Sequence, residues 1–122
     1  MAHILVVDDD AAIRSLIKDI LSGQGHTFEL ASKGSEALEM IRSTRFDLVI
    51  LDRNMPGMDG LEFLQHLRAS PGGASLKVLM CTAAEKMSDV EEAFRSGASD
   101  YIVKPLDFAK LALKVANLTR KK

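Results

Sequence analysis

Four short apolar runs alternate along the chain with segments of helical periodicity. The runs are residues 4–7, 48–51, 78–81 and 101–103. Continuous apolar runs of this length, separated by helical patterns, are typical of parallel strands that are buried on both faces. A fifth segment, residues 27–31, alternates more and carries Glu29, which predicts a less protected strand at the edge of the same sheet.

Apolar residues recur three and four positions apart between these runs, which is the spacing of amphipathic helices. The pattern predicts helices over residues 11–22 and 35–42, and three more that begin near Asp59, Ser88 and Asp107, which are residue types that cap helices. The buried face of the last helix is expected to consist of Phe108, Leu111, Ala112, Val115 and Leu118.

Five strand–helix units in succession predict an α/β fold. Because crossovers between parallel strands are right-handed, the expected architecture is a doubly wound five-stranded parallel sheet with helices on both faces. With residues 27–31 at an edge, the expected strand order is 2-1-3-4-5. We expect one domain over residues 1–122, since a chain of 122 residues can bury a single sizeable core.

Composition narrows the class of protein further. Hydrophobic residues make up 47% and charged residues 27% of the chain, which is ordinary for a folded globular protein. The net charge of -1 gives no reason to expect direct nucleic-acid or membrane binding. The first apolar run begins too near the N-terminus for a signal peptide, and the lone Cys81 excludes an internal disulfide. We therefore expect a cytoplasmic protein.

Each apolar run ends on a polar group suited to phosphate chemistry. These groups are Asp8, Asp9 and Asp10 after the first run, then Asp52, Thr82 and Lys104 after the later ones. In an open α/β sheet, ligands bind just beyond the carboxyl ends of the strands. One cleft would therefore hold carboxylates, a hydroxyl and an ammonium group. Such a set can bind a divalent cation, supply a carboxylate nucleophile and neutralise a phosphoryl group.

Four segments of the sequence occur in an order and at spacings that are typical of one protein family. They are residues 4–9, 51–60, 81–83 and 101–105. With these segments the chain resembles the receiver domain of two-component response regulators, particularly the stand-alone type of the chemotaxis regulator. The resemblance covers nearly all of the chain. It implies a phosphorylation-controlled signalling switch that catalyses only its own phosphoryl transfer and slow self-dephosphorylation.

The resemblance also implies a role for each site residue. Asp52 would accept a phosphoryl group from the phosphohistidine of a sensor histidine kinase or histidine phosphotransfer protein. Asp8, Asp9, Asp52 and the backbone carbonyl of Asn54 would hold Mg²⁺. Thr82 would donate a hydrogen bond to the phosphoryl oxygen, and Lys104 would pair with it.

Further roles follow from the same resemblance. Tyr101 would act with Thr82 in switching, and the Lys104–Pro105 peptide bond would be cis. Asn54 and Ala84 would flank the path of the hydrolytic water and tune the lifetime of the phosphorylated form. A downstream protein would bind the surface of the fourth helix, fifth strand and fifth helix, with the chain a monomer or weak dimer. The sequence leaves open whether the chain is stand-alone or part of a longer protein.

Other interpretations compete with these. Asp10 is better explained as the N-cap of the first helix than as a metal ligand, and Cys81 as a small buried hydrophobe than as a redox group. An aspartate-nucleophile phosphatase would need Asp-x-Asp-x-Thr where this chain has residues 8–12, Asp-Asp-Asp-Ala-Ala. A flavin carrier would need a phosphate loop where this acidic run lies. A degenerate receiver would lack site residues, whereas this chain has each of them.

Overall fold

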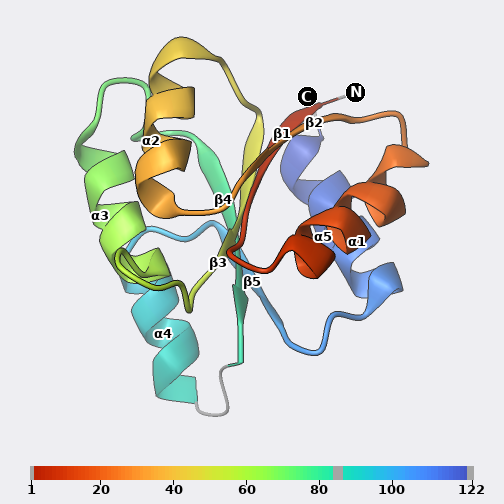
Figure 1. Cartoon of the computed structure of the whole chain (residues 1–122). Coiled ribbons are helices and arrows are strands. Elements are labelled where there is room, and N and C mark those ends of the chain that lie inside the picture. The colour runs from red at the N-terminus through yellow and green to blue at the C-terminus, as the bar shows by residue number, and fades with distance from the viewer. Residues whose placement is uncertain (1, 84–86, 121–122) are drawn as a thin grey trace.

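The computed structural model describes residues 2–83 and 87–120, along which five strands and five helices alternate (Figure 1). The strands are β1 (His3–Val7), β2 (Thr27–Ala31), β3 (Leu48–Asp52), β4 (Lys77–Thr82) and β5 (Asp100–Val103). The helices are α1 (Ala11–Ser22), α2 (Gly34–Ser43), α3 (Gly60–Ala69), α4 (Met87–Arg95) and α5 (Phe108–Thr119). The predicted first helix is confirmed, and the second differs from its prediction by one residue at each end.

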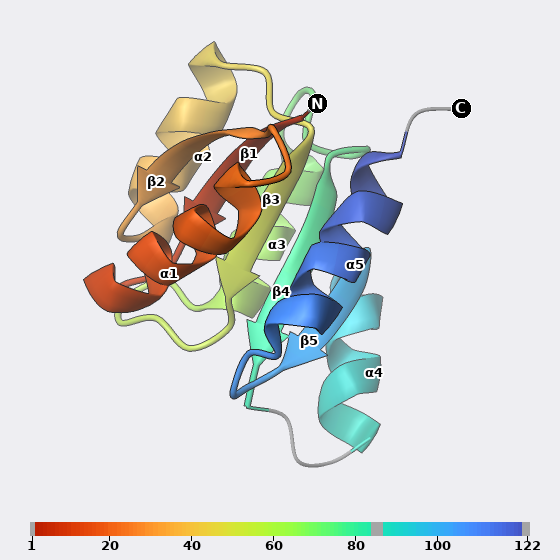
Figure 2. The same cartoon turned by 90° about the vertical axis from the view of Figure 1, so that its right-hand side faces the viewer.

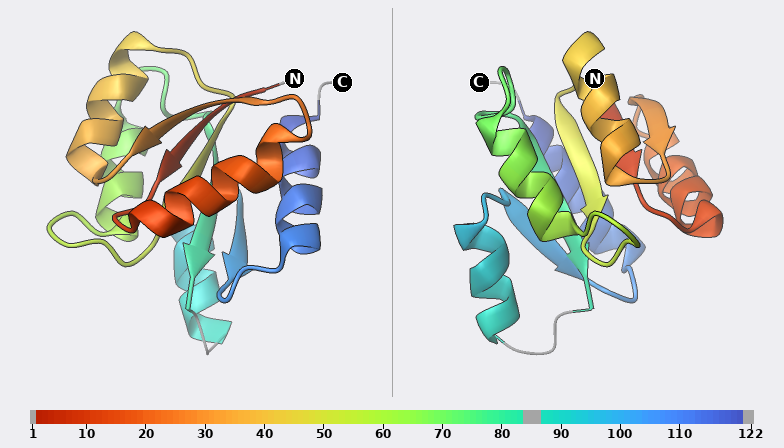
Figure 3. Two further views of the ribbon diagram at one scale, coloured as in Figure 1. Left: turned by 45° about the vertical axis from the view of Figure 1, so that its right-hand side comes forward. Right: turned by 60° about the vertical axis from the view of Figure 1, so that its left-hand side comes forward.

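The strands form one parallel sheet in the order β2-β1-β3-β4-β5, as predicted. Thr27–Ala31 is an edge strand, while all five residues of the central strand β3 are buried. Helices α1 and α5 cover one face of the sheet, which Figure 2 shows in front. Helices α2, α3 and α4 cover the other face, as the right-hand view of Figure 3 shows. The predicted doubly wound α/β architecture is confirmed.

Alternate residues of each strand feed two separate cores, as the pleat requires. In β1, Leu5 and Val7 pack with Phe63 and other residues of the α2–α3–α4 side. Ile4 and Val6 pack on the opposite face, with residues of α1 and α5. This double burial explains why the strands appear in the sequence as continuous apolar runs. It also leaves the ends of the strands as the place for polar chemistry.

Aspartates begin three of the helices. The Asp10 carboxylate accepts from the Ala12 amide (2.8 Å), Asp59 from Glu62 (2.9 Å), and Asp107 from Lys110 (3.0 Å). These bonds satisfy amides that have no partner within their helix and confirm the three predicted caps. The prediction that Ser88 caps α4 is wrong, because Met87 already belongs to that helix.

The buried face of α5 is partly as predicted. Leu111 and Val115 are completely buried, but Phe108 is 54% exposed. Phe108 is the first residue of the helix, and its side chain is exposed although the helical repeat places it on the apolar face. None of the described helices is long and apolar enough to span a membrane.

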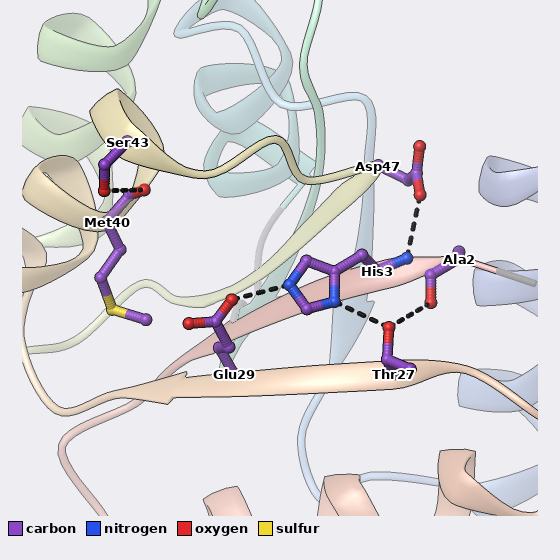
Figure 4. Close-up of polar contacts among 7 residues, drawn as sticks. All are labelled: Ala2, His3, Thr27, Glu29, Met40, Ser43 and Asp47. Atoms are coloured by element: carbon purple, nitrogen blue, oxygen red, sulfur yellow. Dashed lines mark hydrogen bonds and ion pairs between the residues drawn. The ribbon is translucent and has the colours of Figure 1, made fainter.

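At the amino ends of the strands a second set of polar contacts fixes the edge of the sheet (Figure 4). The His3 ring lies within hydrogen-bond distance of Thr27 Oγ1 and Glu29 Oε2, each at 2.7 Å. The ring also stacks on Phe46 with 4.9 Å between centroids, and the His3 amide donates to Asp47 (2.9 Å). These contacts join β1, β2 and the segment before β3 at the end of the sheet opposite the predicted site.

Candidate functional site

The polar residues that follow or end the strands converge at the carboxyl edge of the sheet. In the strand register, Val7 lies beside Leu51, Asp52 beside Cys81, and Thr82 beside Val103. Asp8, Asp52 and Thr82 are the buried polar side chains of the described residues, each exposed by 4% or less. Burying polar groups is unfavourable unless they gain partners, so their clustering at one edge marks a site built for binding or chemistry.

Three carboxylates form the acidic part of the site. Asp8, Asp9 and Asp52 each offer an oxygen atom, and these atoms lie within 4.8 Å of one another. Asp8 and Asp52 are buried, whereas Asp9 is exposed and forms the solvent side of the cluster. Two carboxylates about 4 Å apart repel by roughly 4 kcal/mol at an effective dielectric near 20. The cluster therefore favours a bound cation, and its hard oxygen donors suit Mg²⁺.

The electrostatics of Asp8 reflect this crowding. The pKa of the Asp8 carboxyl is raised to about 6, mainly by burial, and the charges of Asp52 and Asp9 act in the same direction. The Asp10 amide, which donates to Asp8 Oδ1 at 2.9 Å, and the Lys104 ammonium act in the opposite direction. The folded protein thus holds Asp8 in a place where its negative charge is unfavourable without a further cation.

Lys104 reaches into the site from the residue after β5. Its Nζ donates to Asp52 Oδ1 at 2.8 Å, and the Asn54 amide donates to the same oxygen at 3.2 Å. Burial lowers the pKa of Lys104, but the hydrogen bond and charge of Asp52, with the charge of Asp8, outweigh it, so the pKa lies above its ordinary value. Lys104 is therefore a fixed positive charge next to Asp52.

Backbone contacts hold the loops of the site at defined positions. The Lys104 amide donates to the Thr82 carbonyl (2.8 Å), and the Lys104–Pro105 peptide bond is cis, as predicted. The Arg53 amide donates to the Cys81 carbonyl (2.9 Å), and the Arg53 carbonyl accepts from Gly60 (2.8 Å). A Cβ at Gly60 would lie 2.7 Å from Arg53 Cα, so this approach requires glycine.

The residues predicted for switching lie beside this cluster. Thr82 ends β4, and Tyr101 pairs with Met80, two residues earlier on that strand. The Tyr101 ring meets Phe94 of α4 edge-on at 5.8 Å, and Lys114 Nζ of α5 lies 5.2 Å from its centroid. Tyr101 thus joins the three elements α4, β5 and α5.

Two predicted lifetime residues have different outcomes. Asn54 is exposed in the loop after β3, and its backbone N–H donates a hydrogen bond to the Asp52 carboxylate. Ala84 lies outside the described residues. Sequence reasoning gave no role to Arg53 or Gly60, although both lie within residues 51–60, which carried the family likeness. Their contacts are tertiary and have no local sequence pattern.

The chain belongs to the response regulator receiver domain family, whose pattern it matches over residues 4–116. It is 43% identical over 119 residues to "Response regulator MprA" of Mycobacterium ulcerans, covering 98% of this chain and 50% of that protein. It is 42% identical over 113 residues to "Transcriptional regulatory protein ZraR" of Klebsiella oxytoca, covering 93% of this chain and 25% of that protein. The chain thus spans about half or less of the curated relatives it matches.

The fold is also similar to solved structures of response regulators. The chemotaxis response regulator CheY4 of Vibrio cholerae superimposes with a TM-score of 0.91 at 33% identity, covering 97% of this chain and 98% of that one. Receiver domains of two-component systems are signalling switches that in general bind Mg²⁺ and interact with histidine kinases and downstream targets. The predicted family and general function are therefore confirmed. The carboxylate cluster of this chain fits the metal that the family binds.

Proposed function

We propose that this chain takes a phosphoryl group from a phosphohistidine of a sensor histidine kinase or histidine phosphotransfer protein onto Asp52. The single observation that carries the proposal is the hydrogen bond from Lys104 Nζ to the buried Asp52 Oδ1 (2.8 Å), within a cluster of three carboxylates. Of the three carboxylates, that of Asp52 lies on the central strand and forms a salt bridge with Lys104. It is therefore the carboxylate best placed to react with a phosphoryl donor.

In the proposed transfer, a carboxylate oxygen of Asp52 forms a bond to phosphorus while the bond from phosphorus to the donor histidine nitrogen breaks. Lys104 offsets the negative charge of the phosphoryl group, and the Thr82 hydroxyl donates a hydrogen bond to one of its oxygens. Asp8, Asp9, Asp52 and the Asn54 carbonyl would hold Mg²⁺, which would supply positive charge that offsets the charges of the carboxylates and of the phosphoryl group. Positioning and charge neutralisation are the main contributions such a site can make.

The lifetime of the phosphorylated form would depend on Asn54 and Ala84. A methyl group at position 84 can neither orient a water molecule nor accept its proton, and positioning a nucleophilic water is much of what a site contributes to hydrolysis. Self-dephosphorylation is therefore proposed to be slow. Ala84→Glu should speed it by up to about tenfold, which corresponds to roughly 1.4 kcal/mol in the barrier. Equal or slower loss of the phosphoryl group, followed by intact mass, would exclude this role.

The phosphoryl group is proposed to draw Thr82 toward Asp52 and to let Tyr101 move inward. This movement would remodel the surface of α4, β5 and α5, where a downstream protein would bind. A groove of about 470 Å³ on this surface is lined by Tyr101, Val103, Leu113 and Lys114, among others, and Leu113 is 62% exposed. Exposed apolar side chains beside a groove are suitable for a protein partner.

The decisive experiment is incubation with acetyl phosphate and Mg²⁺, followed by intact-mass measurement. The wild type should gain one phosphoryl group and Asp52→Asn none. Asp10→Asn is a matched control, because Asp10 is exposed and caps α1, and asparagine caps helices equally well; it should be phosphorylated like the wild type. An unmodified wild type would favour the degenerate-receiver alternative, and full phosphorylation of Asp52→Asn would exclude Asp52 as the acceptor.

A further inference from the structure

An ion pair connects the residue after Asp52 to helix α4. Arg53 Nη2 lies 2.6 Å from Glu92 Oε1, and the two residues are 39 positions apart in the sequence. The Arg53 side chain is 21% exposed and that of Glu92 is 49% exposed, so the pair lies at the surface with its cation more covered. The loop that follows the candidate phosphoryl acceptor is therefore attached electrostatically to a helix of the proposed partner surface.

The backbone of Arg53 is fixed on both sides. Its amide donates to Cys81 (2.9 Å), its carbonyl accepts from Gly60 (2.8 Å), and Gly60 approaches so closely that a Cβ there would lie 2.7 Å from Arg53 Cα. The backbone has little room to move when the charge at Asp52 changes. Any response of Arg53 must therefore come from its side chain, which has several rotatable bonds.

Among the side chains that the structure describes, helix α4 has fewer buried ones than any of the other helices. Of its side chains that the structure describes, only that of Ala93 is buried, and Phe94 is 45% exposed. Each of the other four helices buries at least two residues. In Figure 2, α4 lies beyond β5 at the margin of the sheet. The ion pair with Arg53 is therefore one of few described contacts that hold α4 in position, together with the contact of Phe94 with Tyr101.

We propose that Arg53 is a positioning residue that holds α4 through Glu92 in the unphosphorylated protein and turns toward the phosphoryl group once Asp52 carries one. The inference rests on the proposed function. Phosphorylation brings a charge of about −2 and new acceptor oxygens next to Arg53, and a guanidinium binds phosphate oxygens with charge-assisted hydrogen bonds. Glu92 competes for the same guanidinium, so it opposes phosphoryl binding and Arg53 transmits the change to α4.

The test is the affinity for beryllofluoride, a phosphoryl mimic, measured with Mg²⁺ in excess for the wild type, Glu92→Gln, Arg53→Gln and the double variant. Partly exposed ion pairs contribute modestly, so Glu92→Gln should tighten binding by about 1.5- to 5-fold. The same substitution in the Arg53→Gln background should have no effect. Glu39→Gln is the matched control, because Glu39 forms an exposed ion pair with Arg42 on α2; its affinity should equal that of the wild type.

The outcomes separate this inference from the proposed function. Loss of a merely structural contact would weaken binding, whereas the inference requires tighter binding that depends on Arg53. Equal affinity in the wild type and Glu92→Gln, or the same tightening with and without Arg53, would overturn the inference and leave Asp52 as the acceptor. A wild type that binds no beryllofluoride and takes no phosphoryl group from acetyl phosphate would overturn both.

Discussion

Replacing Asp8 by asparagine should stabilise the metal-free protein at neutral pH. The Asp8 side chain is 3% exposed, and burial raises the pKa of its carboxyl from 3.8 to about 6. At pH 7.5 the ionised group therefore disfavours the folded state by an amount that, at about 1.4 kcal/mol per pKa unit, is at most about 3 kcal/mol. Asparagine removes the charge and can still accept the Asp10 amide, which lies 2.9 Å from Asp8 Oδ1. We expect a gain of about 1–3 kcal/mol, or several degrees in melting temperature.

The pH dependence of this gain gives it a signature. Because the pKa of Asp8 is higher in the folded than in the unfolded chain, the folded protein binds this proton more tightly. The stability that the wild type gains from protonation of Asp8 is fully present below about pH 4 and is lost as the pH rises through about 6. The difference between Asp8→Asn and the wild type should therefore be largest at pH 7.5 and should nearly vanish toward pH 4.

The assay is thermal unfolding followed by circular dichroism, with a chelator present, at pH 4.5 and pH 7.5. Asp10→Asn serves as control: Asp10 is exposed, lies next to the cluster and caps α1, so its replacement should change the melting temperature little at either pH. Melting temperatures of Asp8→Asn and the wild type that coincide at pH 7.5 would refute the reasoning. So would a gain of equal size at both pH values, because it would not come from the carboxyl charge.

Three further predictions concern the same region. Mg²⁺ at tenfold excess over its dissociation constant should stabilise the wild type by about 1.4 kcal/mol but should hardly stabilise Asp9→Ala. The measurement is thermal unfolding with and without Mg²⁺, and an unchanged wild-type curve would contradict the metal site. Gly60→Ala should lower the free energy of unfolding by about 1–3 kcal/mol in urea titrations, because the added Cβ would lie 2.7 Å from Arg53 Cα. Gly23→Ala is the control: Gly23 has open space around it, so this substitution should not lower the free energy of unfolding. Cys81 should react with a thiol reagent at pH 8 only after denaturation, because burial raises the pKa of its thiol to about 12; rapid reaction of the native protein would show that the site opens.

The strand order and the site were predictable because both depend on local signals. Double burial makes a strand such as residues 48–52 appear as a continuous apolar run, and right-handed crossovers then fix where its neighbours lie. Once the strands are placed, Asp8, Asp52 and Thr82 must meet at their carboxyl ends. Caps such as Asp107 were predictable for a similar reason, since a cap interacts with amides only a few residues away.

The features that sequence reasoning missed depend on contacts between distant segments. Helical periodicity places Phe108 on the apolar face of α5, but it does not reveal which residues of that face the rest of the protein covers, and this ring is exposed. Arg53 and Glu92 are 39 residues apart, and charged residues are common on helices, so no local sequence pattern predicts that these two form an ion pair. Gly60 resembles any glycine at a helix start until the approach of the Arg53 backbone is seen.

The contacts of Glu29 also bear on how this protein avoids aggregation. β2 pairs with β1 and is outermost in the sheet, which is the position where a strand of another copy could add. The Glu29 side chain, held 2.7 Å from His3 and still 40% exposed, places a charged group midway along this strand. An incoming strand would have to bury that charge. The residue that helps to fix the His3 ring therefore also makes this edge a poor template for intermolecular sheet growth.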